Sequence, residues 1–269
     1  MPLDDTLRSA RSQGSRIVVP YVMVDRSRLD RLDRTVLALR QGGATALELG
    51  FPFSDPIADG PVLEAAAGRA LDHGTSWRDL LAACRIASRT LPTAVMTYAN
   101  PVWQEGLPRG LRQLSSAGAT GLIVPDLSLE ESPPWSRASR STGISLVMLA
   151  APGSSPERTR QLARSSRGFL YLVSRYGTTG SAARDPSVDL RPIVRIAHRT
   201  SPELPVLVGF GVRDRESAAR ALSTGADGVV VGSALEELLA SRPPSSAVTR
   251  WIRAIASEPG PAHRTAPRR

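Results

Sequence analysis

The chain has 269 residues, of which 41% are hydrophobic and 4% aromatic. This length fits one large domain with a mainly aliphatic core. The net charge of +9 comes from 34 basic residues, all of them arginine. The arginines are dispersed among acidic residues, with no aromatic-interleaved basic stripe, so we expect no nucleic-acid binding. Because the sequence has no lysine, it excludes Schiff-base chemistry and covalently held pyridoxal phosphate in this chain.

Targeting signals and reactive side chains are sparse. No apolar run approaches the roughly 18 residues of a membrane span, and the polar stretch Met1–Gly14 lacks a signal-peptide core. We therefore expect a cytoplasmic protein with no membrane association. Cys84 has apolar neighbours at helical spacing, which predicts a buried structural thiol. The scattered histidines His73, His198 and His263 predict neither a catalytic triad nor a metal site.

Short β-branched runs alternate with helical patterns from Arg16 to about Ser257. Strict alternation predicts a parallel sheet with right-handed crossovers, and eight such units predict a single-domain (β/α)8 TIM barrel over residues 1–257. Residues 258–269 have no apolar periodicity and predict a disordered tail. The expected strands are Ile17–Met23, Ala46–Leu49, Thr93–Thr97, Gly121–Val124, Ser145–Leu149, Gly168–Val173, Pro205–Val208 and Gly228–Val231. The expected helices are Leu29–Arg40, Trp77–Thr90, Leu107–Ala117, Glu130–Ser141, Pro156–Ser165, Val188–Thr200, Arg215–Thr224 and Ala247–Ser257.

Several boundaries carry local signals. Ser76 is placed to cap a helix, and Asp79 supports it through the helix dipole. Pro156 after Ser155 suits a first helical turn. The segments SAGATG at 116–121 and STGADG at 223–228 each predict a helix ending at glycine before a strand.

The second expected strand and the segment after it contain the strongest candidates for catalytic residues. A barrel places its site at the carboxyl ends of the strands. Glu48 alternates with Leu47 and Leu49, and burial would raise its pKa into the range useful for general acid–base catalysis. Asp59 follows in a proline-rich loop that can turn back over the barrel. Two carboxylates in different settings can divide acid and base roles; from spacing alone, a structural glutamate and a surface aspartate fit equally well.

Glycines follow the last two expected strands. Gly209, Gly211 and Gly232, with Ser233, lie where barrels commonly bind phosphate through backbone N–H groups and a helix N-terminus. Tight turns without a ligand are the alternative for any single glycine. Two such sites at adjacent strand ends favour a phosphate site.

The segment ALELGFPFSDPIADGPVLEAA, which includes Glu48 and Asp59, resembles a hallmark stretch of the tryptophan synthase α-subunit family. Further similar segments follow in order: MTYANPVWQEG from Met96, GLIVPDLSLEES from Gly121, GFLYLVSRYGTTG from Gly168, LVGFGV from Leu207 and VVVGSAL from Val229. The resemblance covers nearly everything between about Ile17 and Leu239, and agreement over some twenty residues in one stretch is highly specific.

This resemblance implies retro-aldol cleavage of indole-3-glycerol phosphate to indole and D-glyceraldehyde 3-phosphate. Glu48 would be the main proton shuttle, and Asp59 would accept a hydrogen bond from the indole N–H. Tyr171 would orient Glu48. The residues implied to line the indole pocket are Tyr21, Tyr98 and Phe210, and core packing is an equal alternative for Tyr98 and Phe210.

The resemblance also implies a flap and a partner. Gly177, Thr179 and Gly180 would form a mobile flap that closes over the substrate phosphate, with Arg175 nearby. The expected partner is a β subunit in an α2β2 heterotetramer, and pyridoxal phosphate would reside only in that subunit, so we expect no cofactor in this chain. The residues at the implied interface are Asp55, Pro56, Asn100 and Pro101. Closure of the flap would then be coupled to the partner.

Two departures from the family pattern leave alternatives open. Met23 stands after the first strand where the family usually has a threonine, and Ser128 stands where the family often has proline at the partner contact. A stand-alone indole-3-glycerol phosphate lyase and a non-catalytic regulatory partner of a β subunit are the two alternatives. Retention of Glu48, Asp59 and Tyr171 argues against the second.

Overall fold

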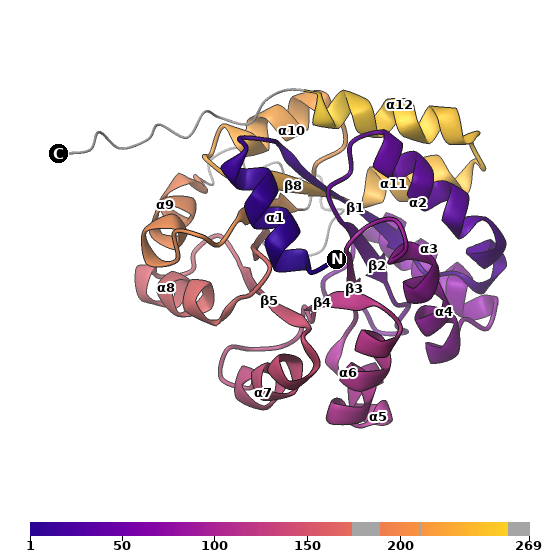
Figure 1. Ribbon diagram of the computed structural model, residues 1–269, viewed down its shortest axis with the longest axis horizontal. Coiled ribbons are helices and arrows are strands. Elements are labelled where there is room, and N and C mark those ends of the chain that lie inside the picture. Colours follow the sequence, from indigo (N-terminus) through magenta and orange to yellow (C-terminus); the bar gives the residue numbers. More distant parts are fainter. Residues whose placement is uncertain (174–188, 210, 258–269) are drawn as a thin grey trace.

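Eight parallel strands close into a barrel in the computed structural model, which describes residues 1–173, 189–209 and 211–257 (Figure 1). Each strand pairs with the next in sequence, and β8 pairs with β1. The strands are β1 (Ile17–Met23), β2 (Leu47–Gly50), β3 (Thr93–Met96), β4 (Ala119–Ile123), β5 (Ser145–Ala150), β6 (Leu170–Val173), β7 (Val206–Gly209) and β8 (Gly228–Val231). The predicted (β/α)8 barrel is confirmed.

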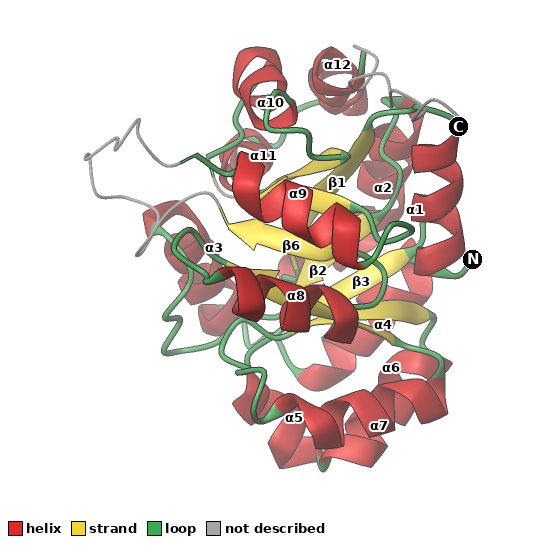
Figure 2. Cartoon of the chain, turned by 90° about the vertical axis from the view of Figure 1, so that its left-hand side faces the viewer, coloured by secondary structure: helices red, strands yellow, loops and turns green. Residues whose placement is uncertain are grey.

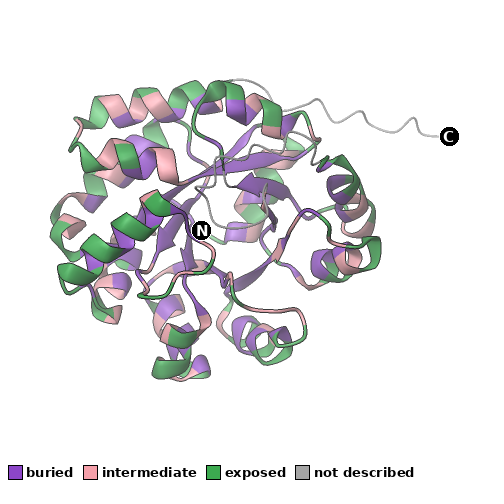
Figure 3. Cartoon of the chain, turned by 180° about the vertical axis from the view of Figure 1, so that it is seen from behind, coloured by how far each residue is buried: buried purple, intermediate pink, exposed green. Residues whose placement is uncertain are grey.

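Helices surround the barrel and bury its strands, with their own outer faces exposed (Figure 3). The elements that match the predicted helices are η1 (Arg26–Arg31) with α2 (Leu32–Gln41), α4 (Trp77–Ala87), α6 (Leu107–Ser116), α7 (Ser132–Thr142), α8 (Pro156–Ser165), α9 (Arg191–Thr200), α10 (Arg215–Leu222) and α12 (Ser245–Ala256). Those not predicted are α1 (Leu3–Ser12), α3 (Pro61–Asp72), α5 (Ala99–Glu105) and α11 (Ser233–Ala240). None of the described helices is long and apolar enough to span a membrane. The predicted tail, 258–269, lies outside the described residues.

Alternate strand residues separate into an inner and an outer core. On β2, Leu47 and Leu49 belong to the outer cluster between the sheet and the helices. Glu48 lies between them and is paired in register with Tyr21 on β1 and Ala94 on β3, both members of the inner cluster. Because successive side chains on a strand point to opposite faces, this register places Glu48 on the inner face of the barrel.

The amino ends of the strands are closed by α1, which lies at the end of the barrel opposite to that toward which β6 points (Figure 2). Leu3 and Leu7 of this helix are buried in the inner cluster. A Cβ added at Gly121 would lie 2.6 Å from Leu3 Cδ2, so β4 needs glycine where the helix plugs the barrel. This closure leaves the carboxyl ends of the strands as the accessible end.

The predicted local signals are present. Ser76 and Asp79 form a capping box at α4, in which the Ser76 backbone N–H donates to Asp79 Oδ2 at 2.8 Å. The Ser155 hydroxyl accepts the Arg158 N–H at 3.1 Å. Gly118 and Gly225 have φ of 95° and 90°, a region that favours glycine. Cys84 is buried, and desolvation raises the pKa of its thiol to about 12, as expected for a structural thiol.

Candidate active site

Glu48 is a carboxyl group without a hydrogen-bond partner. Its side chain is 0% exposed, and neither carboxyl oxygen has a hydrogen-bond partner among the described residues. Buried polar groups are usually satisfied, and an orphaned one points to a function or to a missing ligand. Desolvation, followed by the negative charge of Asp59, raises the pKa of Glu48 to about 8. The group is therefore mainly protonated at neutral pH.

Asp59 is the second carboxyl group of this region. The chain leaves β2, passes through the loop 51–60 and brings Asp59 back to a position that is 5% exposed, just before α3. Burial, followed by the charge of Glu64, raises the pKa of Asp59 to about 6. At neutral pH Asp59 is mainly ionised while Glu48 is mainly protonated. One acid and one base are thus available in the same electrostatic environment.

Tyr171 on β6 faces the same interior and is 4% exposed. Burial, then the charges of Glu48 and Asp59, hold its pKa well above the ordinary range, so its hydroxyl remains a proton donor. Space for its ring comes from β7, because a Cβ on Gly209 would lie 2.4 Å from the Tyr171 ring. Glycine is therefore required at position 209 to make room for the Tyr171 ring, in addition to the phosphate contact predicted for Gly209.

Tyr21 reaches the same region from β1. It is 4% exposed, and a Cβ on Gly50 would lie 1.8 Å from its hydroxyl oxygen. That hydroxyl contacts the Met23 sulfur at 3.6 Å. Burial, then the charges of Asp59, Glu236 and Glu48, raise the pKa of Tyr21 well above its usual value. The residue that departs from the family pattern, Met23, therefore lies beside the predicted indole pocket.

Tyr98 holds the loop that carries Asp59. Its hydroxyl accepts the Ala58 N–H at 3.0 Å, and its ring stacks on Phe53 with centroids 5.1 Å apart. Both contacts fix the loop between β2 and α3, adjacent to Asp59. Tyr98, predicted to line the indole pocket or to pack in the core, is 4% exposed and also positions this loop.

The predicted phosphate site is described in part. Gly211 follows β7 with φ 86°, and Gly232 precedes Ser233, the first residue of α11. The N-terminus of this helix supplies backbone N–H groups that favour an anion. Phe210 and the predicted flap residues Gly177, Thr179 and Gly180, together with Arg175, lie outside the described residues.

The predicted interface residues lie on the surface beside two exposed apolar side chains. Asp55 and Asn100 are exposed, while Pro56 and Pro101 are half-buried. Ile57 and Trp103, in the same two segments, are 68% and 51% exposed. Large exposed apolar side chains in adjacent segments are typical of a contact surface.

A further buried carboxyl group, that of Glu236, was not predicted from the sequence. Glu236 on α11 is 1% exposed; it accepts the Met23 N–H at 2.8 Å and pairs with Arg28 at 2.9 Å. Asp25 pairs with His73 at 3.0 Å and lies 3.7 Å from Arg28. His73 is the C-cap residue of α3, and its ring nitrogen contacts the Asp25 carboxylate from that position. In the sequence, Glu236 lies in the exposed-looking pair Glu236-Glu237, and nothing local marks it as buried.

The fold and these side chains together define a class of protein: a (β/α)8-barrel enzyme with a buried, mainly protonated glutamic acid inside the barrel and an ionised aspartate near it. The sequence profile of the family described as "Tryptophan synthase alpha chain" matches residues 7–255. The chain therefore belongs to the tryptophan synthase alpha chain family, a family of carbon–carbon lyases in tryptophan biosynthesis.

Individual relatives agree with this assignment. The chain is 40% identical to the tryptophan synthase alpha chain of Synechococcus elongatus over 236 residues, covering 86% of this chain and 87% of that one. It is 40% identical to that of Oceanobacillus iheyensis over 241 residues, covering 88% and 90%. A solved structure of Mycobacterium tuberculosis tryptophan synthase is similar with a TM-score of 0.85 and 33% identity, covering 97% of this chain and 98% of that chain.

Proposed function

We propose that this chain cleaves indole-3-glycerol phosphate to indole and D-glyceraldehyde 3-phosphate, as the α subunit of a tryptophan synthase. The observation that carries the proposal is the pair of carboxyl groups near the carboxyl end of β2. Glu48 has its pKa raised to about 8 and Asp59 to about 6. Near pH 7 this pair offers a proton and a negative charge at once.

The chemistry follows from these two protonation states. The Glu48 carboxylic acid donates its proton to C3 of the indole ring, which places positive charge on the ring nitrogen. The Asp59 carboxylate accepts a hydrogen bond from the indole N–H and stabilises this charge, an effect on the order of a few kcal/mol in a dry site.

The bond between C3 and C3′ then breaks, and its electrons return to the ring. The Glu48 carboxylate removes the proton of the C3′ hydroxyl as the aldehyde forms, so Glu48 begins and ends the cycle protonated. Tyr171 and Tyr21, both held neutral, line the same interior. Neither Glu48 oxygen has a hydrogen-bond partner among the described residues, so we assign to Tyr171 the orientation of the Glu48 carboxyl group in the substrate complex. The chain has no lysine, so this acid–base route replaces an imine. We assign no cofactor to this chain.

The substrate phosphate binds at Gly211, Gly232 and Ser233, together with Gly209 and Gly180. The N-terminus of α11 supports this assignment, since helix N-termini favour anions. The proposed partner is a β subunit, which would hold pyridoxal phosphate and contact Asp55, Pro56, Asn100 and Pro101 in an α2β2 assembly. The exposed side chains of Ile57 and Trp103 supply the apolar part of this contact.

The direct test is incubation of the purified chain with indole-3-glycerol phosphate, followed by measurement of indole and glyceraldehyde 3-phosphate in equal amounts. Addition of a β subunit distinguishes an α subunit of tryptophan synthase from a stand-alone indole-3-glycerol phosphate lyase. We expect the rate to rise with the β subunit. A high rate that the β subunit does not change would favour a stand-alone lyase, and absence of both products in either arm would contradict the proposed reaction.

A further inference from the structure

A hollow beside the end of β1 does not include the catalytic carboxyl groups proposed above, although Met23, which contacts Tyr21 in that site, is one of its lining residues. It has a volume of about 250 Å³ and is lined by residues from the end of β1, η1, α2, α3, the end of α11 and the segment after it. Glu48, Asp59 and Tyr171 are not among its lining residues. Drug-sized ligands occupy clefts of roughly 300–1,000 Å³, so this hollow fits a smaller molecule.

The floor of the hollow is apolar. Val22 and Val24 at the end of β1 and Leu32 of α2 line it and are buried, and all three belong to the outer core cluster. The half-buried Leu29 and Leu239 complete the apolar wall. A ligand that fills this space must therefore present an apolar body to the floor.

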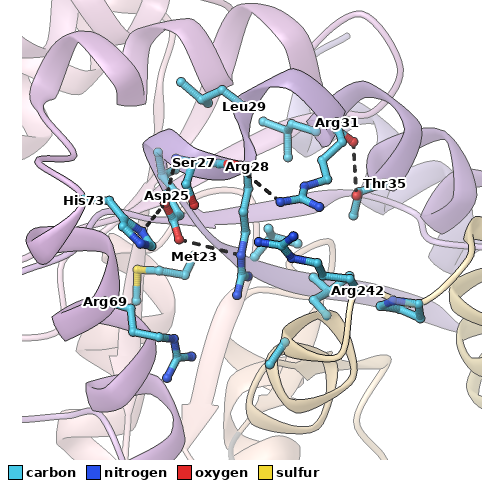
Figure 4. Close-up of a pocket in the computed structure, with 16 residues that line it drawn as sticks. Met23, Asp25, Ser27, Arg28, Leu29, Arg31, Thr35, Arg69, His73 and Arg242 are labelled. Carbon is cyan, nitrogen blue, oxygen red and sulfur yellow. Dashed lines mark hydrogen bonds and ion pairs between the residues drawn. The ribbon is translucent and has the colours of Figure 1, made fainter.

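The rim of the hollow is basic. Arg28, Arg31, Arg69 and Arg242 line it from three separate parts of the chain (Figure 4). One of these charges is already neutralised, because Arg28 pairs with the buried Glu236 at 2.9 Å and lies 3.7 Å from Asp25. Arg28 therefore serves to fix the rim.

Of the other three arginines, Arg69 acts electrostatically on the buried Glu236 and offsets part of the rise in the pKa of that group, whereas Arg31 and Arg242 have no buried counter-charge among the described residues. The ion pair of Arg31 is with Asp30, at 3.9 Å, and that carboxylate is 82% exposed, where an ion pair contributes little. The Arg31 guanidinium also donates to the Ser27 carbonyl oxygen at 3.4 Å. Arg69 and Arg242 form no ion pair with any residue of the described ranges. Figure 4 shows the side chains of Arg31 and Arg242 extending toward the same space. Convergence of like charges over an apolar floor favours an anion between them.

The backbone at Arg242 supports a specific role. Its φ of 52° is the single positive value at a residue other than glycine among the described residues. A non-glycine residue in the left-handed region costs energy and often marks a functional position. Here that conformation ends α11 and directs the Arg242 side chain over the hollow.

We propose that this hollow binds a small organic anion, with a phosphate or carboxylate group held by Arg31 and Arg242 and an apolar body on Val22, Val24 and Leu32. Planar guanidinium groups bind such oxyanions through paired hydrogen bonds. The site is separate from the proposed phosphate site at the opposite end of α11. It does not depend on the proposed reaction.

Crystals grown with 4-bromophenyl phosphate test the proposal, because the anomalous signal of bromine locates the ring. We expect a bromine peak over Val22 and Val24, with the phosphate between Arg31 and Arg242. The compound combines an aromatic ring with a phosphate, so a peak inside the barrel is expected as well and decides nothing about the hollow. Absence of a peak at the hollow overturns the proposal.

Binding of the same compound to variants, measured by calorimetry, tests the arginines. The double variant Arg31→Gln/Arg242→Gln is expected to lose the hollow site, with affinity there reduced roughly tenfold or more, and its crystals should keep only the peak inside the barrel. Arg34→Gln, on the exposed face of α2, is the matched control and should bind as the unaltered chain does. If the double variant retains the hollow site with unchanged affinity, the role of the arginines is wrong.

Discussion

Each end of the barrel buries a carboxyl group. The one at the amino end has several hydrogen-bond partners, and the one facing the carboxyl end has none among the described residues. At the amino end, Asp227 accepts hydrogen bonds from Arg11 Nε at 2.8 Å and the Val206 N–H at 2.7 Å, and it pairs with His198 at 2.8 Å. Burial alone would raise its pKa, but these partners lower it. Glu48, facing the carboxyl ends, has no such partner among the described residues, and its pKa is raised to about 8.

This difference separates a stabilising group from a reactive one. A buried carboxylate with several donors is held in its charged form and connects α1, α9 and β7. A buried carboxyl group with none remains protonated at neutral pH and can give its proton to a ligand. The comparison therefore predicts that changes at the two ends affect different quantities: activity at Glu48 and stability at Asp227.

The largest expected effect is on activity. Glu48→Gln keeps the shape of the side chain but removes the acidic proton, and general acid–base catalysis contributes about 10²–10⁴-fold. We expect indole formation to fall by that factor, with the free energy of unfolding unchanged or increased. Glu216→Gln, an exposed position on α10, is the control and should retain full activity. Unreduced indole formation by Glu48→Gln would contradict the proton-shuttle role.

The next effect is on stability. Asp227→Ala removes the shared acceptor of Arg11, His198 and Val206 and should cost about 3–5 kcal/mol of unfolding free energy, as for other broken buried ion pairs. Urea denaturation measures this loss. Asp189→Ala, which removes an exposed partner of Arg191, should change the unfolding free energy little. The folded fraction of Asp227→Ala should keep its kcat, and a selective loss of kcat would show that the amino end takes part in catalysis.

Opposite pH dependences follow from the two pKa shifts. Glu48 has a pKa of about 8 in the folded chain and an ordinary value of 4.5, so its ionisation opposes folding and stability falls between those two pH values as pH rises. Asp227 has a lowered pKa, so its contribution is present above its ordinary value of 3.8 and is lost as pH falls below it.

The free energy of unfolding, measured at pH 5, 6.5 and 8, tests the direction of these pH dependences. The stability of Glu48→Gln relative to the unaltered chain should increase with pH, by on the order of a few kcal/mol at the alkaline end. Asp227 stays ionised over the same range, so its own titration adds no pH dependence to the stability deficit of Asp227→Ala. A constant difference for Glu48→Gln would mean that the pKa of Glu48 is not raised in the folded chain.

The two ends also differ in how far the sequence predicts them. The alternation of Leu47, Glu48 and Leu49 predicts that the glutamate and the leucines face opposite sides of the strand, because a strand has a period of two residues; the structure shows that Glu48 is on the inner side. Asp227 lies in a segment that resembles a simple turn, and its partner Arg11 is 216 positions away. Such a pairing exists only after the chain has folded, so no local pattern indicates it.

Helices that cover the barrel ends were missed for a related reason. The helix α1 has only Leu3 and Leu7 as buried residues, so its pattern is too short to stand out from the polar start. The helix α11 has eight residues and follows a glycine that predicted a phosphate turn. Glu236 on that helix is buried because Met23 and Arg28, more than 200 positions earlier, provide its donors. Tertiary contacts, rather than helical periodicity, determine these elements.

The smallest expected effect is that of a glycine substitution at the carboxyl end of the barrel, which should change both stability and KM. An alanine at Gly50 would place its Cβ 1.8 Å from the Tyr21 hydroxyl oxygen, so the ring must move within the region shared with Glu48 and Asp59. Overpacking of this kind costs about 1–3 kcal/mol of unfolding free energy, and we expect Gly50→Ala to raise KM as well.

The control is Gly68→Ala on α3, where an added Cβ meets nothing within 4 Å. This variant should instead gain about 0.5–1 kcal/mol of unfolding free energy from helix propensity. Because Tyr21 can rotate, a loss of stability at Gly50 with unchanged KM would mean that its ring lies outside the substrate pocket and serves only the core.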